Sequence, residues 1–237
     1  MPDHEIAGAT ALVTGASRGF GRGIATTLSQ AGAQVTGVAR DRGPLEELRA
    51  ELGGAFTAVA ADAADPNVAG RLVDAHRPRI LVLNAGATPL PRPIQRHTWE
   101  TFSRNWDVDV RHAFGWTREA LLAPLAPGSI VITLSSGAAL RGSPLSGGYA
   151  GAKAAIRWLT SYAAQESARE GLGIRFVSLL PQLTPATELG AVFAAAYGTQ
   201  GPALTRERVG QAVIELIAGS DPGQDAYLLT AAGLRPL

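Results

Sequence analysis

The sequence predicts an α/β fold, in which a doubly wound parallel sheet of about seven strands is flanked by helices on both faces. Short, almost continuously apolar runs alternate with helical stretches nearly from end to end. This alternation is typical of a parallel sheet covered on both faces. The chain has 237 residues, and we find no internal repeat and no linker in it. A single domain spanning residues 1–237 is therefore expected.

Seven runs have the length and apolar content of buried strands. In chain order they are residues 10–14, 34–39, 56–60, 80–83, 129–134, 174–180 and 226–230. Six segments between or after them have helical patterns, namely residues 21–30, 44–52, 66–76, 98–122, 148–170 and 206–218. Pro44 and Pro66 suit a first helical position, and Asp65 and Thr205 suit an N-cap.

Residues 182–204 interrupt the alternation with Pro, Gly, Thr and an apolar patch. A long excursion at the C-terminal end of a strand is often a lid, so we expect a substrate lid here. Its residues Leu189, Val192, Phe193 and Tyr197 favour a largely apolar substrate.

The composition excludes several classes of protein. The net charge is +1, with 46% hydrophobic and 17% charged residues, which is unlike a nucleic-acid binder or a disordered chain. Cysteine is absent, so disulfides and thiolate catalysis are excluded. No apolar run approaches a membrane span, and a cytoplasmic protein is expected. The four histidines, at positions 4, 76, 97 and 112, lack metal-ligand spacing, so we expect no metal and place them at the surface or an interface.

A glycine-rich turn joins the first strand to the first helix. Residues 14–21 read Thr-Gly-Ala-Ser-Arg-Gly-Phe-Gly, with glycines at 15, 19 and 21. Glycines let the backbone turn tightly and approach a ligand, and the N-terminus of the following helix offers unpaired N–H groups to a pyrophosphate. The alternative is a glycine turn with no ligand, but the strand–turn–helix context favours nucleotide binding.

Lys153 is the only lysine among the 21 Lys and Arg of the chain. Tyr149 precedes it by four residues, so the two side chains share one face of a helix. Lysine carries a compact ammonium on a flexible stem and can pass protons, whereas arginine does not release its proton. A site that retains lysine in an arginine-rich chain indicates a need for the ammonium group.

Four motifs occur together and in order: Thr14-Gly-x-x-x-Gly19-x-Gly21, Asn84-Ala-Gly86, Ser136 and Tyr149-x-x-x-Lys153. In this order and spacing they resemble the short-chain dehydrogenase/reductase family, over nearly the whole chain. The resemblance implies a Rossmann-like sheet and a nicotinamide cofactor. It implies the cofactor contacts Gly15, Ser17, Arg18, Gly19, Phe20, Gly21, Arg40, Asp62, Asn84, Ala85, Gly86, Tyr149, Lys153, Pro181 and Thr184.

The catalytic roles follow from the chemistry of the expected reaction. A hydride delivered to a carbonyl leaves an alkoxide that needs a proton, and a neighbouring ammonium helps a phenol to supply it. Tyr149 is thus expected to be the general acid in reduction and the base in oxidation. Ser136 would hydrogen-bond the substrate oxygen, with Ser135 as the competing candidate. By resemblance, Lys153 also binds the nicotinamide ribose.

Charge after the second strand favours NADP(H) over NAD(H). An NAD-selective enzyme places an acidic residue there for the ribose 2′-hydroxyl, but this chain has Arg40, and Arg18 lies in the glycine turn. Two guanidinium groups can clamp a phosphate. The alternative is a pair of solvated arginines, and Asp41 complicates the choice if the turn is displaced by one residue.

Two positions depart from the family pattern. Asp109 stands where the family's proton relay usually has asparagine. We expect Asp109 to serve an altered relay, to favour the ammonium form of Lys153, or to be replaced by Asn105, one turn earlier. After the sixth strand the run is Pro181-Gln-Leu-Thr184-Pro-Ala-Thr187, and Thr184 is the candidate nicotinamide contact, with Thr187 as the alternative.

The sequence thus predicts an NADP(H)-dependent oxidoreductase acting on a carbonyl, or its alcohol, of a largely apolar small molecule or carrier-bound 3-oxoacyl group. The rival function is a cofactor-binding sensor or scaffold with little turnover, and a non-redox lyase is a weaker rival. Trp106, Trp116 and Trp158 are expected to fill a core or subunit interface. A homo-oligomer, either dimer or tetramer, is expected through the two long helices.

Overall fold

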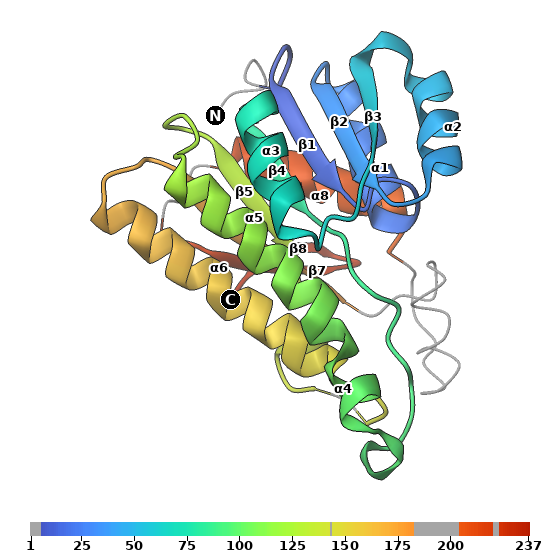
Figure 1. The fold of residues 1–237 in the computed structure, drawn as a ribbon. Helices are drawn as coiled ribbons and strands as arrows, with labels where there is room; N and C mark the ends of the chain where they lie inside the picture. Colours follow the sequence, from blue (N-terminus) through green and yellow to red (C-terminus); the bar gives the residue numbers. More distant parts are fainter. Residues whose placement is uncertain (1–5, 143, 183–203, 220–222) are drawn as a thin grey trace.

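The computed structural model describes residues 6–142, 144–182, 204–219 and 223–237. Within this part of the chain, eight strands form one sheet in the order β3-β2-β1-β4-β5-β6-β7-β8 (Figure 1). Strands β1 to β7 pair in parallel, and β8 pairs antiparallel with β7. The strands are β1 Thr10–Thr14, β2 Gln34–Ala39, β3 Phe56–Ala60, β4 Ile80–Leu83, β5 Ile130–Leu134, β6 Arg175–Pro181, β7 Ala226–Thr230 and β8 Gly233–Pro236. The predicted doubly wound α/β fold is confirmed.

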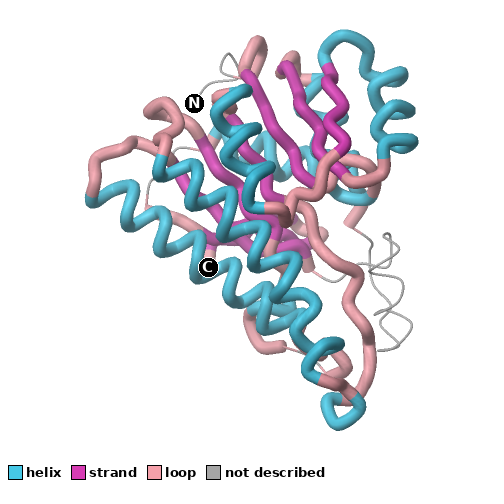
Figure 2. Tube along the Cα trace, in the orientation of Figure 1, coloured by secondary structure: helices cyan, strands magenta, loops and turns pink. Residues whose placement is uncertain are grey.

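Helices cover both faces of this sheet, as the cyan and magenta segments of Figure 2 show. They are α1 Gly19–Gln30, α2 Arg42–Leu52, α3 Pro66–His76, α4 Trp99–Asn105, α5 Arg111–Leu122, α6 Tyr149–Arg169 and α8 Arg206–Ala218. Helices α1, α2 and α8 share one buried cluster with the strands, and α3, α5 and α6 share the other. Shorter helical turns are η2 Gly53–Ala55, η3 Ile94–Arg96, η4 Trp106–Val110 and η5 Gly137–Ala139.

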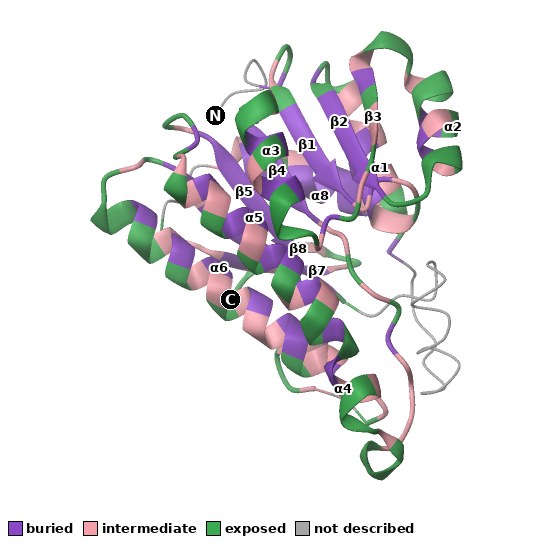
Figure 3. Cartoon of the chain, in the orientation of Figure 1, coloured by how far each residue is buried: buried purple, intermediate pink, exposed green. Residues whose placement is uncertain are grey.

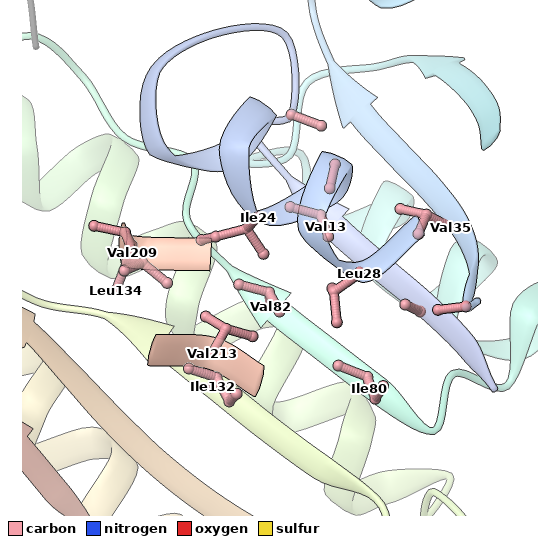
Figure 4. Packing of buried hydrophobic residues seen from close by; sticks show 14 of the residues in the cluster. Val13, Ile24, Leu28, Val35, Ile80, Val82, Ile132, Leu134, Val209 and Val213 are labelled. Carbon is pink, nitrogen blue, oxygen red and sulfur yellow. The ribbon is translucent and has the colours of Figure 1, made fainter. Parts of the chain in front are cut away.

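The central strands are buried on both faces, which explains why they read as nearly continuous apolar runs. Val13 of β1 packs with Ile24 of α1 and Val209 of α8 in the first cluster (Figure 4). Its neighbour Leu12 points to the opposite face and packs in the second cluster with Trp116 of α5. Successive strand residues face opposite sides of a sheet, so one strand supplies both cores.

Three of the four residues predicted at helix starts hold the predicted positions, and Pro66 is the first residue of α3. Asp65 and Thr205 are the N-caps of α3 and α8, and each side chain accepts a backbone N–H of its first turn. Pro44, however, is the third residue of α2 and not the first, so that prediction is wrong. The reason is Asp41, whose carboxylate accepts the Gly43 N–H and starts the helix earlier.

Two further features were not predicted. The long helix expected at residues 98–122 contains a π-helical turn, η4, between α4 and α5. Strand β8 extends the sheet beyond β7, although it is only four residues long and contains Pro236. Of the expected lid at 182–204, residues 183–203 lie outside the described residues. No helix within the described ranges has both the length and the apolar character needed to cross a bilayer.

Candidate active site and cofactor pocket

A pocket of about 1710 Å³ opens at the carboxyl ends of the central strands. Strand order reverses between β1 and β4, and ligands of doubly wound sheets bind at such a switch point. The predicted site residues that line it are Gly15, Ser17, Arg18, Gly19, Phe20, Arg40, Asp62, Asn84, Ala85, Gly86, Asp109, Ser136, Tyr149, Lys153 and Pro181. Gly21 is not part of the lining, and Thr184 and Thr187 lie outside the described residues.

The glycine turn after β1 depends on its three glycines for two different reasons. Gly15 and Gly19 have φ angles of +67° and +54°, a region that side chains rarely adopt. A Cβ at Gly21 would collide with the carbonyl oxygen of Gly15. Arg18 is the N-cap residue of α1, and its side chain makes no capping bond. The first N–H groups of α1 therefore face the pocket without a side-chain cap, as an anion site requires.

Asn84 fixes this turn to the end of β4. Its Nδ2 donates to the carbonyls of Thr14 and Gly15, at 3.1 and 3.2 Å. The Thr14 hydroxyl in turn accepts the N–H groups of Asn84 and Ala85. Asn84 is therefore more than a simple turn residue, because it ties the glycine turn to the neighbouring central strand.

The pocket end beside β2 and β3 is lined by Arg18, Arg40 and two carboxylates, Asp41 and Asp62. Arg40 follows β2 directly and is exposed in the lining. The neighbouring Asp41 carboxylate is bound to the start of α2, and the Asp62 carboxylate accepts the Ala64 N–H at 2.9 Å. Each carboxylate thus has a backbone partner that fixes its position and leaves its negative charge in place.

Lys153 and Asp109 form a buried ion pair beneath the pocket. The Lys153 Nζ lies 3.2 Å from Asp109 Oδ2 and donates to the Leu134 carbonyl at 3.1 Å. Burial by itself would lower the pKa of Lys153, but the Asp109 carboxylate, together with Tyr149, raises it above its ordinary value. Lys153 is consequently held as an ammonium, 5.6 Å from the ring centre of Tyr149.

The π-helical turn η4 and the chain after β4 hold Asp109 in place. Asp109 Oδ1 accepts the Ala87 N–H at 2.7 Å, and a Cβ at Gly86 would lie 2.9 Å from Oδ2. Asn105 donates to the Ala87 carbonyl at 2.9 Å and lies 3.5 Å from both carboxylate oxygens. Asn105 therefore supports the loop and Asp109, while Asp109 makes the direct contact with Lys153.

The two serines at the end of β5 have different surroundings. Ser135 is buried and donates its hydroxyl to the Lys153 carbonyl at 2.7 Å. Ser136 is half-buried, and its oxygen accepts the Ala138 N–H at 3.2 Å. The Ser136 hydroxyl hydrogen can therefore be donated into the pocket, which favours Ser136 over Ser135 as the residue that meets a substrate.

His112 was expected at the surface or an interface, and this is wrong. It lies in α5, one turn after Asp109, is buried, and lines the pocket. Burial, reinforced by the Lys153 charge, lowers the pKa of His112 to about 3. Among the described residues, no group forms a hydrogen bond with its Nε2. Spacing of three residues from Asp109 was the available signal, because such residues share a helix face.

The tryptophans lie outside the pocket lining. Trp116 is fully buried and donates its indole N–H to the Ala63 carbonyl at 2.9 Å. Trp106 and Trp158 are 41% and 53% exposed, on η4 and α6. No three His, Asp or Glu side chains gather as metal ligands anywhere in the described residues.

These features together fit a nicotinamide dinucleotide. The glycine turn and the N-terminus of α1 suit a pyrophosphate, and Arg40 lies at the strand end where the adenosine ribose is recognised in such sheets. Ser136, Tyr149 and Lys153 line the same pocket, and Lys153 Nζ lies 5.6 Å from the ring centre of Tyr149. One pocket thus contains both a glycine turn suited to a phosphate and groups suited to proton transfer.

Known proteins that bind a nicotinamide cofactor resemble this chain over most of its length. A family model described as short chain dehydrogenase matches residues 9–197. D-erythrulose reductase of Gallus gallus is 34% identical over 168 residues, covering 70% of this chain and 68% of the relative. The 3-ketoacyl-(acyl-carrier-protein) reductase of Brucella melitensis, solved with NADH, has 29% identity and a TM-score of 0.80, over 90% of this chain and 92% of the other. A Beutenbergia cavernae protein described as an NAD(P)-dependent gluconate 5-dehydrogenase, with NADP bound, has 31% identity and a TM-score of 0.78, over 90% and 91%.

Proposed function

Since the chain belongs to the short-chain dehydrogenase family, we propose that it is an NADP(H)-dependent oxidoreductase that reduces a carbonyl group or oxidises the matching alcohol. The observation that supports this most is that Ser136, Tyr149 and Lys153 line one pocket together with the glycine turn. A module that only binds a cofactor has no need of all three. The substrate is a largely apolar small molecule or a carrier-bound 3-oxoacyl group.

A bound nicotinamide cofactor supplies the hydride in reduction and accepts it in oxidation. The Ser136 hydroxyl donates a hydrogen bond to the substrate oxygen as charge develops there. Tyr149 gives its proton to that oxygen in reduction and takes it back in oxidation. The Lys153 ammonium, fixed by Asp109 and the Leu134 carbonyl, stabilises the phenolate that Tyr149 becomes when it gives up its proton.

The proton-transfer role is tested with Tyr149→Phe. We expect turnover on a panel of ketones to fall by about 10²- to 10⁴-fold, while NADPH affinity stays within a few-fold. Tyr162→Phe is the matched control, because Tyr162 lies on the same helix and is 56% exposed. Full activity of Tyr149→Phe would overturn the mechanism. Tight NADPH binding by the wild type without oxidation of any ketone would instead favour the sensor.

Preference for NADP(H) is supported by Arg40, which follows β2 where an NAD-selective enzyme carries an acidic residue. Titration of the protein with NADPH and NADH, followed by fluorescence, should show tighter binding of NADPH. In Arg40→Gln the ratio of NADPH affinity to NADH affinity should fall about tenfold or more, since charge-assisted bonds to phosphate are strong. Arg42→Gln, in the first turn of α2 and outside the pocket lining, should leave it unchanged. Equal affinity of the wild type for both cofactors would contradict the preference.

We also propose that the chain forms a homo-oligomer through α5 and α6. The face that these two helices turn away from the sheet carries exposed residues (Figure 3). Among them are Phe114 of α5 and the stacked pair Trp158 and Tyr162 of α6, each more than half exposed. Aromatic groups of this size are usually covered by a partner when they gather on a surface.

A further inference from the structure

Two arginines from separate elements line the pocket that also holds Ser136 and Tyr149. Arg141 lies in the loop after η5, and Arg235 lies on β8. Both side chains line the pocket. They belong to parts of the chain far apart in sequence, which the fold brings to one place.

Strand register explains why Arg235 faces the pocket. Leu234 of β8 pairs with Leu229 of β7, and both pack toward the cluster under α8. Arg235 and its partner Leu228 therefore face the opposite side of the sheet. Leu228 also lines the pocket, and its Cδ1 lies 3.6 Å from where a Cβ on Gly137 would be. Arg235 is thus on the same side as η5 and the loop that carries Arg141.

Neither of these two arginines has an ion pair within the described residues. Helix arginines elsewhere commonly do, as Arg77 with Asp74 at 3.0 Å. The acidic residues in the pocket lining are all bonded within the protein: Asp41 to the Gly43 N–H, Asp62 to the Ala64 N–H, Asp109 to Lys153 and Glu207 to Arg206. The positive charge at the substrate end is consequently available to a ligand.

We propose that Arg141 and Arg235 bind an anionic group of the substrate, a carboxylate or a phosphate, while its carbonyl lies at Ser136 and Tyr149. This rests on the proposed function. Guanidinium groups bind both oxyanions in the same bidentate way. Beside the arginines the lining includes Leu140, which precedes Arg141, and Leu228, the β7 partner of Arg235, and both suit an apolar spacer. The substrate class is therefore an oxo acid or a phosphorylated ketone whose middle is apolar.

Matched pairs of ketones test this directly. We would compare 4-oxopentanoate with its methyl ester, and 4-oxopentyl phosphate with 5-hydroxypentan-2-one, because each pair keeps the same carbonyl and apolar spacer and changes the charge. The pair with the larger preference distinguishes carboxylate from phosphate. In the wild type, kcat/KM should be about tenfold or more higher for the charged member. Arg141→Gln and Arg235→Gln should each remove most of this preference by raising KM for the charged member. For the neutral member, kcat/KM should stay within about twofold of the wild-type value.

Arg104→Gln is the control variant, since Arg104 is an exposed arginine of α4 outside the pocket lining. It should leave both members of each pair unchanged. Equal kcat/KM for charged and neutral members in the wild type, or a loss for both in the arginine variants, would overturn the anion site.

A binding measurement separates this inference from the proposed function. With NADP⁺ saturating, 4-oxopentanoate and inorganic phosphate are titrated into the wild type and the two variants by calorimetry. Binding of either probe that both variants weaken supports the anion site, even if no ketone is reduced and the proposed function fails. Absence of binding of both probes, alongside reduction of neutral ketones, overturns the anion site and leaves the proposed function standing.

Discussion

Asp109 stabilises the fold in a way that a neutral residue at this position would not, because its carboxylate is buried against the buried ammonium of Lys153. Its carboxylate provides the charge that offsets the burial of Lys153. Removing one member of a buried ion pair typically costs about 3–5 kcal/mol, since the other charge is left without compensation. We therefore predict that Asp109→Asn lowers the free energy of unfolding by about this amount near neutral pH, and that it also lowers turnover.

The pH dependence of that loss identifies its cause. In the wild type the pKa of Lys153 is raised, so its contribution to stability is present below the pKa of an unfolded lysine and is lost above it. In Asp109→Asn burial dominates and lowers the pKa of Lys153, so the variant regains stability as pH rises toward that of the unfolded lysine. The difference in unfolding free energy between the wild type and Asp109→Asn should therefore be smaller at about pH 9.5 than at about pH 7, and urea unfolding at both pH values measures it. Asp107→Asn, an exposed residue of the same π-helical turn, is the control, and a pH-independent gap would contradict the explanation.

His112 makes the protein sensitive to acid. Its pKa is lowered from 6.5 to about 3 by burial and by the charge of Lys153. The stability that neutral His112 contributes is present above pH 6.5 and is lost as pH falls toward 3, because the unfolded chain binds a proton that the folded chain excludes. From about pH 7 to pH 4.5 this amounts to about 2.5 kcal/mol. Between these pH values His112→Leu should lose less unfolding free energy than the wild type, by that amount. An equal loss in both proteins would show that His112 is not the cause.

Helices α1 and α8 approach closely because glycines lie at their contact. A Cβ at Gly210 would collide with the Thr27 side chain, and one at Gly23 would lie 2.5 Å from the Arg206 carbonyl oxygen. Gly210→Ala should destabilise the protein by about 1–3 kcal/mol through overpacking, as measured by urea unfolding. Gly115→Ala on α5 has nothing within 4 Å of its new Cβ and should stabilise by up to about 1 kcal/mol. If both variants changed stability in the same direction, close packing would not be the cause.

Elements whose own residues carry the signal were predictable, and elements that depend on tertiary partners were not. The seven parallel strands follow from their apolar runs, because burial on both faces leaves a mark on each strand by itself. Strand β8 pairs only with β7 in the part of the chain that the structure describes. It also contains Pro236, so its local sequence argues against a strand. The π-helical turn η4 likewise has no local signal, since its role is to place Asp109 against Lys153.

Over the whole molecule, the pocket is assembled from the ends of strands that are distant in sequence. The motif residues could be predicted because each motif follows a recognisable strand, and parallel strands bring their carboxyl ends to one edge. His112 and Arg235 also line the pocket, but they lie within elements whose orientation depends on packing. The direction of the Arg235 side chain is set by the pairing register of β8 in the folded chain, which the local pattern does not encode. For His112 the three-residue spacing from Asp109 indicates a shared helix face, but not that this face is buried.

The surface of α5 and α6 allows a prediction about the assembled protein. Trp158 and Tyr162 stack with ring centres 6.4 Å apart while remaining 53% and 56% exposed. We predict that the 24.5 kDa chain is a dimer or tetramer in solution and that Trp158→Glu shifts it to monomer, because a charge there opposes burial of the face. Light scattering after size exclusion measures the mass. Trp99→Glu is the control, since Trp99 is 76% exposed but lies on α4. It should keep the wild-type mass. A monomeric wild type, or equal masses for Trp158→Glu and the wild type, would show that this face is not the interface.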